Sequence, residues 1–386
     1  MSEKIPNQES LVLAERIETA KSALADFMKL KPEEAVLFLH DDGTDPETLN
    51  ILKSAASQIG STIVEIDLRK RKNKIASEEF ENKAIIDLSE DENDFTSEIY
   101  EKIKETKSRM ASLGDLGPEV FERDGPMSEK LEDLQYRLDK MESVLKEAVG
   151  FKITSVYGTN LEVPLRQAHE RQWYKDAGVI EKGKWDNLPG GEIFTTPDQE
   201  KVRGTLVLPI LESEISPQQG VDEFVRLEIR DGLIISIQGG KSAEKLQKYL
   251  ARDVKDEIKE QKQEFKENGE LKEKGKSRNP GNIYRIAEIA FGANSKARNV
   301  SDPKKSYRKK GVSVVEAEKK LGTMHLAFGD SRHDEEGTEG NSAVVPHHDF
   351  VVPRNGLTVE MFVREDDFEK SSNGRKIISE GGLNFF

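Results

Sequence analysis

Short apolar runs that alternate with an amphipathic segment constrain the first part of this chain most strongly. Residues 35–39 read AVLFL, residues 62–66 read TIVEI and residues 84–88 read AIIDL. Each run has the length and composition of a buried parallel strand. Between the first two runs, Asp45 can cap a helix and Pro46 suits the first helical position. Strand, helix and strand in this order form a βαβ unit, which predicts a parallel sheet with flanking helices.

The pattern changes after residue 150. Residues 151–157 and 204–211 are short β-like runs, and the turn signal Asp231-Gly232 separates two more. A chain of 386 residues is also longer than one core usually serves. We therefore expect an α/β N-terminal domain over residues 1–150, followed by an α+β domain with mostly antiparallel strands over residues 151–386.

Two further segments predict helices of different kinds. Residues 127–149 place leucine, methionine and valine on one stripe between charged residues, as a packing helix does. Residues 242–278 are highly charged, so we expect a solvated helical excursion from the second domain with no chemistry of its own.

The composition excludes several classes of function. The net charge is -14, and an acidic surface disfavours binding to nucleic acid or to an anionic membrane. The chain has no cysteine, which excludes disulfides, cysteine nucleophiles and iron–sulfur clusters. The first ten residues are polar and no run approaches the ~20 apolar residues of a membrane helix. We expect a cytoplasmic protein.

Four of the six histidines lie near the end of the chain. Two of them, together with one nearby aspartate, have a spacing that suits a metal site. His347 and Asp349 are two residues apart in an apolar run, so a strand would point both to one face and His348 to the other. His325, in a second apolar run, would supply a third ligand and leave positions open for catalysis. A histidine buried for packing explains the same spacing equally well.

Two glutamates elsewhere are candidate ligands. Glu192 follows a Pro-Gly-Gly turn that delivers one carboxylate to the start of a strand, although an ordinary turn would do the same. Glu288 is the one charge in the run Ile286–Gly292. A buried carboxylate needs a partner, which is either a bound cation or a lysine or arginine.

Taken in order, these stretches resemble the aminopeptidase T family of metallopeptidases, with its leucyl-aminopeptidase-like and dihydroxypyridine-dioxygenase-like branch. The matching stretches are residues 14–41, 159–165, 187–197, 285–294, 322–329 and 347–352. The resemblance implies five metal ligands, which are Glu192, Glu288, His325, His347 and Asp349. It also implies two divalent ions (zinc, cobalt or manganese), a homodimer, and removal of N-terminal residues from peptides by a metal-activated water.

The chain departs from the family at Arg332, where the family has a tyrosine seven residues after the histidine of its Gly-Thr-x-His segment. Arg332 is therefore a candidate catalytic residue that could stabilise an oxyanion, or it lies on a solvated loop. The neighbouring His333 is a further possible ligand.

Two alternatives to an aminopeptidase follow from the same residues. Two imidazoles and a carboxylate from His325, His347 and Asp349 match the facial triad of non-haem iron(II) enzymes. Such an enzyme would oxidise a hydroxylated aromatic ring, a small-molecule substrate in place of a peptide. An inactive relative is the other alternative. If Glu192 and Glu288 both reach the histidine cluster, two ions are expected, whereas a Glu288 paired with a basic residue would favour one ion and redox chemistry.

Overall fold

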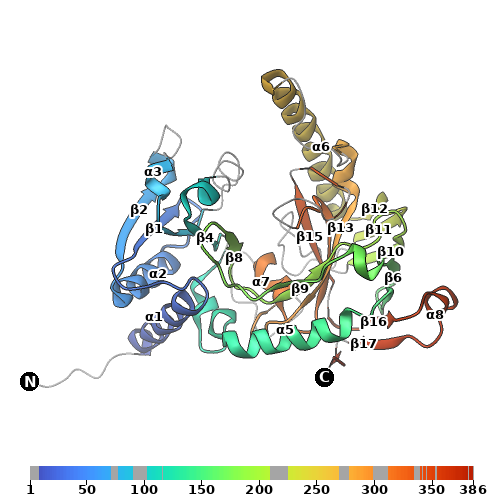
Figure 1. The fold of residues 1–386 in the computed structure, drawn as a ribbon, viewed down its shortest axis with the longest axis horizontal. Helices are drawn as coiled ribbons and strands as arrows, with labels where there is room; N and C mark the ends of the chain where they lie inside the picture. Colours follow the sequence, from blue (N-terminus) through green and yellow to red (C-terminus); the bar gives the residue numbers. More distant parts are fainter. Residues whose placement is uncertain are drawn as a thin grey trace, which may run out of the picture. The chain divides into compact units, whose positions relative to one another are not determined.

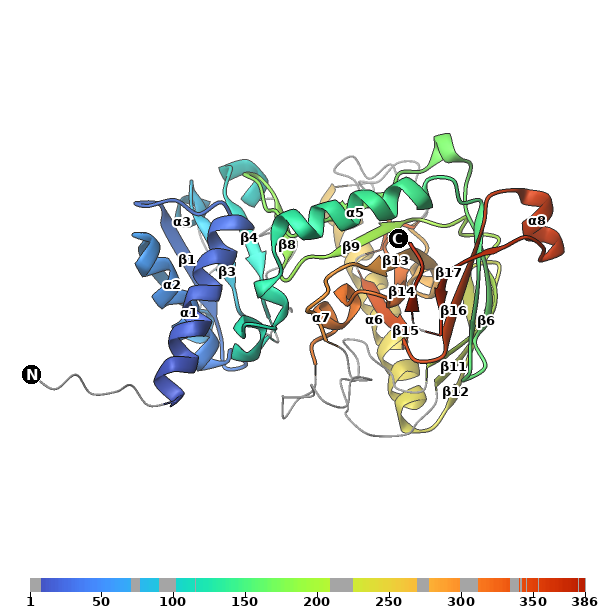
Figure 2. The ribbon, with the colours of Figure 1, turned by 90° about the horizontal axis from the view of Figure 1, so that it is seen from below.

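The computed structural model describes residues 8–385 except for 71–76, 90–101, 115, 209–224, 269–277, 299–311, 334–339, 341, 345, 353 and 381. The chain forms two compact units, which are described one at a time. By residue range, the first unit comprises 1–135, 176–191 and 294–298, and the second comprises 136–175, 192–293 and 299–386. Figures 1 and 2 show the ribbon from two directions.

A five-stranded parallel sheet forms the centre of the first unit. Its order is β2-β1-β3-β4-β8, and neighbouring strands run parallel throughout. The strands are β1 (Ala35–His40), β2 (Thr62–Asp67), β3 (Ala84–Asp87), β4 (Arg109–Ser112) and β8 (Trp185–Asn187). The helices are α1 (Gln8–Asp26), α2 (Pro46–Ile59), α3 (Ser77–Phe80), η1 (Leu68–Lys70), η2 (Pro118–Phe121) and η3 (Pro126–Ser128). The predicted parallel sheet with flanking helices is confirmed.

Strand β1 shows why both faces of this sheet are covered. Val36 and Phe38 pack into a cluster with residues of α1 and α2, whereas Leu37 and Leu39 pack on the opposite face with Phe80. This alternation is the two-residue period of a strand, and it explains why the run is apolar throughout. Helix α2 begins as the sequence predicts, because the carboxylate of its N-cap residue accepts a hydrogen bond from a first-turn amide at 2.8 Å.

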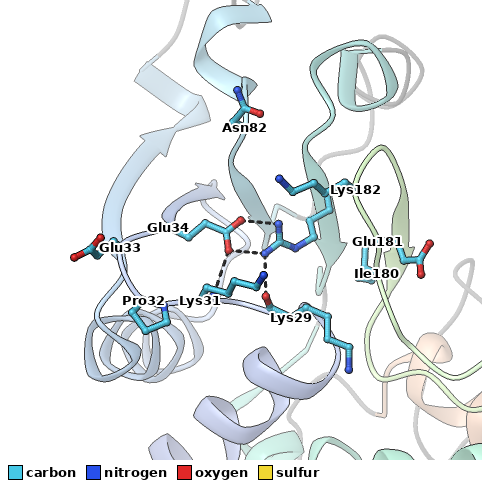
Figure 3. A pocket seen from close by; sticks show the side chains of 10 residues that line it. Lys29, Lys31, Pro32, Glu33, Glu34, Asn82, Ile180, Glu181 and Lys182 are labelled. Atoms are coloured by element: carbon cyan, nitrogen blue, oxygen red, sulfur yellow. Dashed lines mark hydrogen bonds and ion pairs between the residues drawn. The ribbon is translucent and has the colours of Figure 1, made fainter.

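A buried ion pair joins the amino end of β4 to the segment before β1. The guanidinium of Arg109, which is 4% exposed, donates two hydrogen bonds to the carboxylate of Glu34, at 2.6 and 2.7 Å. The pair borders a hollow of about 510 Å³, and Figure 3 shows the side chains that line it, Lys31 and Lys182 among them. Since both charged groups lie largely out of water, removal of either one would leave the other without the opposite charge that stabilises it.

Two sheets form the second unit. The larger has the order β12-β11-β10-β6-β5-β16-β17-β18, and the smaller has the order β15-β14-β13-β9-β7. In chain order the strands are β5 (Gly150–Ser155), β6 (Asn160–Pro164), β7 (Tyr174–Asp176), β9 (Glu192–Thr195), β10 (Arg203–Leu208), β11 (Val225–Arg230), β12 (Leu233–Gly239), β13 (Ile286–Gly292), β14 (Met324–Gly329), β15 (His347–Val352), β16 (Leu357–Phe362), β17 (Arg375–Ser379) and β18 (Gly382–Leu383). The pairings are antiparallel, as predicted.

The second part of the chain also contains helices, which lie around the two sheets. They are α5 (Leu131–Leu145), η4 (Ala168–Glu170), α6 (Lys241–Asn268), η5 (Pro280–Tyr284), α7 (Val314–Lys319) and α8 (Glu365–Lys370). Helix α6 lies within the charged segment, and Figure 1 shows its far end extending beyond the strands of its unit. None of the described helices has the length and apolar character needed to cross a membrane.

The division between the units differs from the single boundary expected at residue 150. Helix α5 crosses from one unit to the other at residue 136, and residues 176–191 return to the first unit. The return has a structural cause, because β8 extends the parallel sheet by pairing with β4. A strand of three residues is too short to leave a periodic signal in the sequence.

We expect Arg109→Ala to lower the free energy of unfolding of the first unit by about 3 kcal/mol, since it leaves the largely buried carboxylate of Glu34 and the carbonyl of Met28 without their partner. Hydrogen exchange of the β1 and β4 amides measures this local loss. Arg69→Ala, which removes an exposed guanidinium with two carboxylate partners, is the control and should change little. Equal exchange in both variants would contradict the importance of the buried pair.

Candidate metal centre

The five ligands proposed from the sequence lie on one face of the smaller sheet of the second unit. Register explains the convergence: Ala327 of β14 lies between Glu288 of β13 and Asp349 of β15, each directly opposite it. Directly opposed residues in antiparallel strands point to the same face. His325 lies two residues before Ala327 and therefore shares that face. An alanine between two acidic positions leaves room for the longer side chains to meet.

His325 is at the centre of the cluster. Its side chain is 1% exposed, and its Nε2 lies 3.1 Å from Glu288 Oε1, 3.4 Å from Glu192 Oε2 and 3.6 Å from Asp349 Oδ1. Three carboxylates therefore surround one imidazole nitrogen. Both Glu192 and Glu288 reach the histidine cluster, which is the arrangement for which the sequence predicts two ions.

His347 completes the group from the first position of β15. Its Nε2 lies 3.6 Å from Asp349 Oδ1 and 3.8 Å from Glu288 Oε2. Its Nδ1 lies 2.7 Å from the carbonyl oxygen of Asp330, to which it can only donate a hydrogen bond. This contact leaves Nε2 as the nitrogen that faces the carboxylates, which is how imidazole ligands of metals are commonly held.

Helix α7 adds two charged residues that sequence reasoning missed. The ammonium of Lys319 lies 2.5 Å from Glu192 Oε1 and 3.0 Å from Glu318 Oε1, and all three residues are less than 10% exposed. Glu318 also forms a ligand-like group with His325 and Asp349. No spacing in the run before His325 marks these two residues, because their role depends on where the helix packs.

Burial and neighbouring charges shift the pKa values of the side chains in this cluster. Burial raises the pKa of Glu192 to about 8 and that of Glu318 to about 7, and Lys319 opposes both shifts only in part. Burial lowers the pKa of His325, but its hydrogen bond to Glu288 and the charges of Glu192 and Asp349 outweigh burial and raise it to about 9. Burial likewise opposes the effect of Asp349 on the pKa of His347, which nevertheless lies well above its ordinary value.

The cluster fits a bound cation. Glu192 Oε2 and Glu318 Oε2 are buried and have no hydrogen-bond partner within the described residues. Buried oxygens of this kind are costly unless a proton or a cation compensates them. Three sets of three side chains hold their ligand atoms within 4.8 Å of one another: Glu192, Glu288 and His325; Glu288, His347 and Asp349; and Glu318, His325 and Asp349. The unit thus contains imidazole and carboxylate groups able to hold a metal.

The remaining candidates lie at the margin of the cluster. Arg332 is held by Asp330, with Nε 2.7 Å from Oδ1 and Nη2 2.8 Å from Oδ2, so its catalytic role stays a prediction. His333 Nδ1 lies 3.5 Å from Glu288 Oε2. His348 faces away from the cluster, as expected from its position, and its Nε2 lies 2.9 Å from Asp253 Oδ2 of α6.

Comparison with known proteins assigns the family. Residues 17–261 match the family model NicX, described as 2,5-dihydroxypyridine 5,6-dioxygenase. A 2,5-dihydroxypyridine 5,6-dioxygenase from Pseudomonas putida is 34% identical over 152 residues, a match that covers 39% of this chain and 41% of that relative. Of the five proposed ligands, Glu192 alone lies within the residues matched by the family model.

Solved structures share the fold over nearly the whole chain. A 2,5-dihydroxypyridine dioxygenase from Pseudomonas putida aligns with a TM-score of 0.62 and 20% identity, covering 98% of each chain. AmpT from Thermus thermophilus aligns with a TM-score of 0.59 and 14% identity, covering 96% of this chain and 99% of that one. At these identities the likeness establishes the fold alone.

These matches correct the function expected from the sequence. The expected aminopeptidase, a hydrolase and protease acting on peptides, is wrong, because the family model and the curated relative are both described as a dioxygenase. The relatives are enzymes, as expected. With the model covering well over half of its length, this chain belongs to the NicX family, the family described as 2,5-dihydroxypyridine 5,6-dioxygenase.

Proposed function

We propose that this chain is a dioxygenase that binds one iron(II) ion and opens a dihydroxylated, nitrogen-containing aromatic ring of the dihydroxypyridine type. The observation that supports this most is the convergence of His325, His347, Asp349 and Glu288 on one buried face in a member of this family. Two imidazoles with one or two carboxylates suit iron(II) among the common metals.

The distances within the group support a single ion held by these four side chains. Ligand atoms lie about 2.0–2.2 Å from a metal, so neighbouring ligands of one ion lie roughly 3 Å apart. Glu288 Oε1 and His325 Nε2 are 3.1 Å apart, and Asp349 Oδ1 is 3.6 Å from Nε2 of both histidines. When bound, a redox-active ion supplies electron transfer between the ring and dioxygen, which protein side chains do not provide.

Lys319 is the reason to propose one ion and not the two implied by the aminopeptidase resemblance. Its ammonium contacts both Glu192 and Glu318, and it already supplies positive charge on that side of the cluster. A second divalent ion there would have to displace a buried ammonium. Here Glu192, and not Glu288, is the carboxylate that carries the basic partner.

The surrounding residues hold the ligands in place. The carbonyl of Asp330 fixes the ring of His347, and Arg332 in turn holds the side chain of Asp330. Val351 packs with Val312 and Ala317 of the α7 region beside Asp349. A homodimer, a small-molecule substrate and a cytoplasmic location without nucleic-acid or membrane partners stay predictions.

We expect the iron-loaded protein to consume oxygen with 2,5-dihydroxypyridine, and we expect His347→Ala and Asp349→Asn to lose both iron and oxygen uptake. Loss of a residue that merely orients a metal ligand commonly costs about ten- to a hundredfold in metal affinity, so loss of a ligand itself should cost at least as much. Elemental analysis and an oxygen electrode measure the two effects. His169→Ala, which removes an exposed imidazole, is the control. Full iron content in both ligand variants would remove these residues from the site.

Lys319→Met should raise the binding capacity for manganese(II) or cobalt(II) from about one ion to about two per chain. The substitution removes the buried ammonium, so Glu192 and Glu318 are left to be compensated either by protons or by a second ion that displaces those protons. Equilibrium dialysis measures the capacity. Lys175→Met, which removes a more exposed lysine with two carboxylate partners, should leave the capacity unchanged. Two ions in the unaltered protein would contradict the proposed role of Lys319.

Metal loading near pH 7.5 should release at least one proton per ion. At that pH the imidazole of His325, whose pKa is raised to about 9, should carry a proton in the metal-free protein, and the pKa of His347 is shifted in the same direction. The ion must displace these protons, so its affinity should rise with pH until the pKa of His325 is passed. Calorimetry in buffers of different ionisation enthalpy counts the protons. Loading without proton release would show that these imidazoles are not ligands.

A further inference from the structure

Two aromatic side chains share the sheet face that carries the candidate metal centre. Phe194 of β9 lies opposite Ala290 of β13, which lies opposite His325 of β14. The three residues thus form one row across the sheet, with Phe194 about 10 Å from His325 along the row. The residue between them is an alanine, whose methyl group takes little of the space above the sheet.

Tyr174 of β7 extends this aromatic surface. Its ring stacks on Phe194 with centroids 5.3 Å apart and planes inclined by 21°. His333 connects the pair to the ligands, because its ring lies 5.1 Å from Phe194 and 5.9 Å from His347. A continuous series of rings therefore leads from β7 to a proposed metal ligand.

The pair differs in exposure from the aromatic residues of the nearby core. The neighbouring aromatic residues Trp173 and Phe291 contact each other and Phe151, and all three are buried. Tyr174 and Phe194 instead remain partly exposed. The side chains of the consecutive residues Trp173 and Tyr174 thus point to opposite sides. Trp173 packs in the buried apolar core, whereas Tyr174 lies on the sheet face that carries the candidate ligands.

We propose that Phe194 and Tyr174 form a wall on which the planar ring of the substrate stacks beside the metal. The inference rests on the proposed function, since it assigns the residues that recognise the aromatic substrate of that function. Aromatic rings attract one another in stacked and edge-to-face arrangements at centroid distances of about 4.5–7 Å. The exposed part of this pair would offer that contact to a flat ring whose hydroxyl groups reach the ligands.

The test compares Phe194→Leu and Tyr174→Leu with the unaltered protein, because leucine keeps apolar bulk and removes the ring. Calorimetry without oxygen measures binding of 2,5-dihydroxypyridine to cobalt-loaded protein, and the KM for oxygen uptake is measured with iron. The Kd and the KM should each rise about tenfold in both variants. The visible spectrum of bound cobalt and its affinity for azide, a non-aromatic ligand, should stay the same. Tyr136→Leu, which removes a tyrosine that is 63% exposed on α5, is the matched control.

The outcomes separate this inference from the proposed function. Turnover by the unaltered protein with an unchanged Kd and KM in both variants would overturn the wall and leave the function standing. Binding that weakens in both variants, without turnover by any form, would support the wall and overturn the function. Absence of binding to the unaltered protein would overturn both.

Discussion

Buried negative charge on one sheet face is the constraint on which the rest of the second unit depends. Glu192, Glu288 and Glu318 are each less than 10% exposed, and Asp349 lies among them. Carboxylates removed from water require compensation by protons, cations or hydrogen bonds. Lys319 supplies part of it, and the surrounding carboxylates raise the pKa of the imidazoles of His325 and His347, so that protons on these rings supply more. A divalent ion would provide that charge, and the three sets of ligand atoms within 4.8 Å of one another are arranged to accept one.

The parts of the site that follow from local periodicity could be predicted from the sequence. The spacing of His347 and Asp349 places both on one face of a strand, and Glu288 stands out as a charge within an apolar run. Glu318 and Lys319 could not be predicted, because their contribution depends on the packing of a six-residue helix in a charged segment. The fold shows the same limit: the long strands and helices are predictable, whereas the return of β8 to the first sheet is not.

The donor set also explains why the reaction was harder to predict than the site. Imidazoles and carboxylates bind zinc, manganese and iron alike, and the chemistry then follows the ion. A buried ammonium beside Glu192 favours one ion over two, and a stacked aromatic pair beside the cluster favours a flat ring over a peptide. Both features arise from contacts between elements far apart in sequence. Neither the ammonium nor the aromatic pair produces a local sequence pattern that would distinguish a peptidase from an oxygenase.

Anomalous X-ray scattering at the iron edge, from crystals loaded with iron(II) without oxygen, tests the central claim most directly. It locates the ion without depending on the reaction or the substrate. One peak within ligand distance of Glu288, His325, His347 and Asp349, with Lys319 still in contact with Glu192, is the predicted result. A peak elsewhere, two peaks in the cluster, or none at full loading would contradict the account.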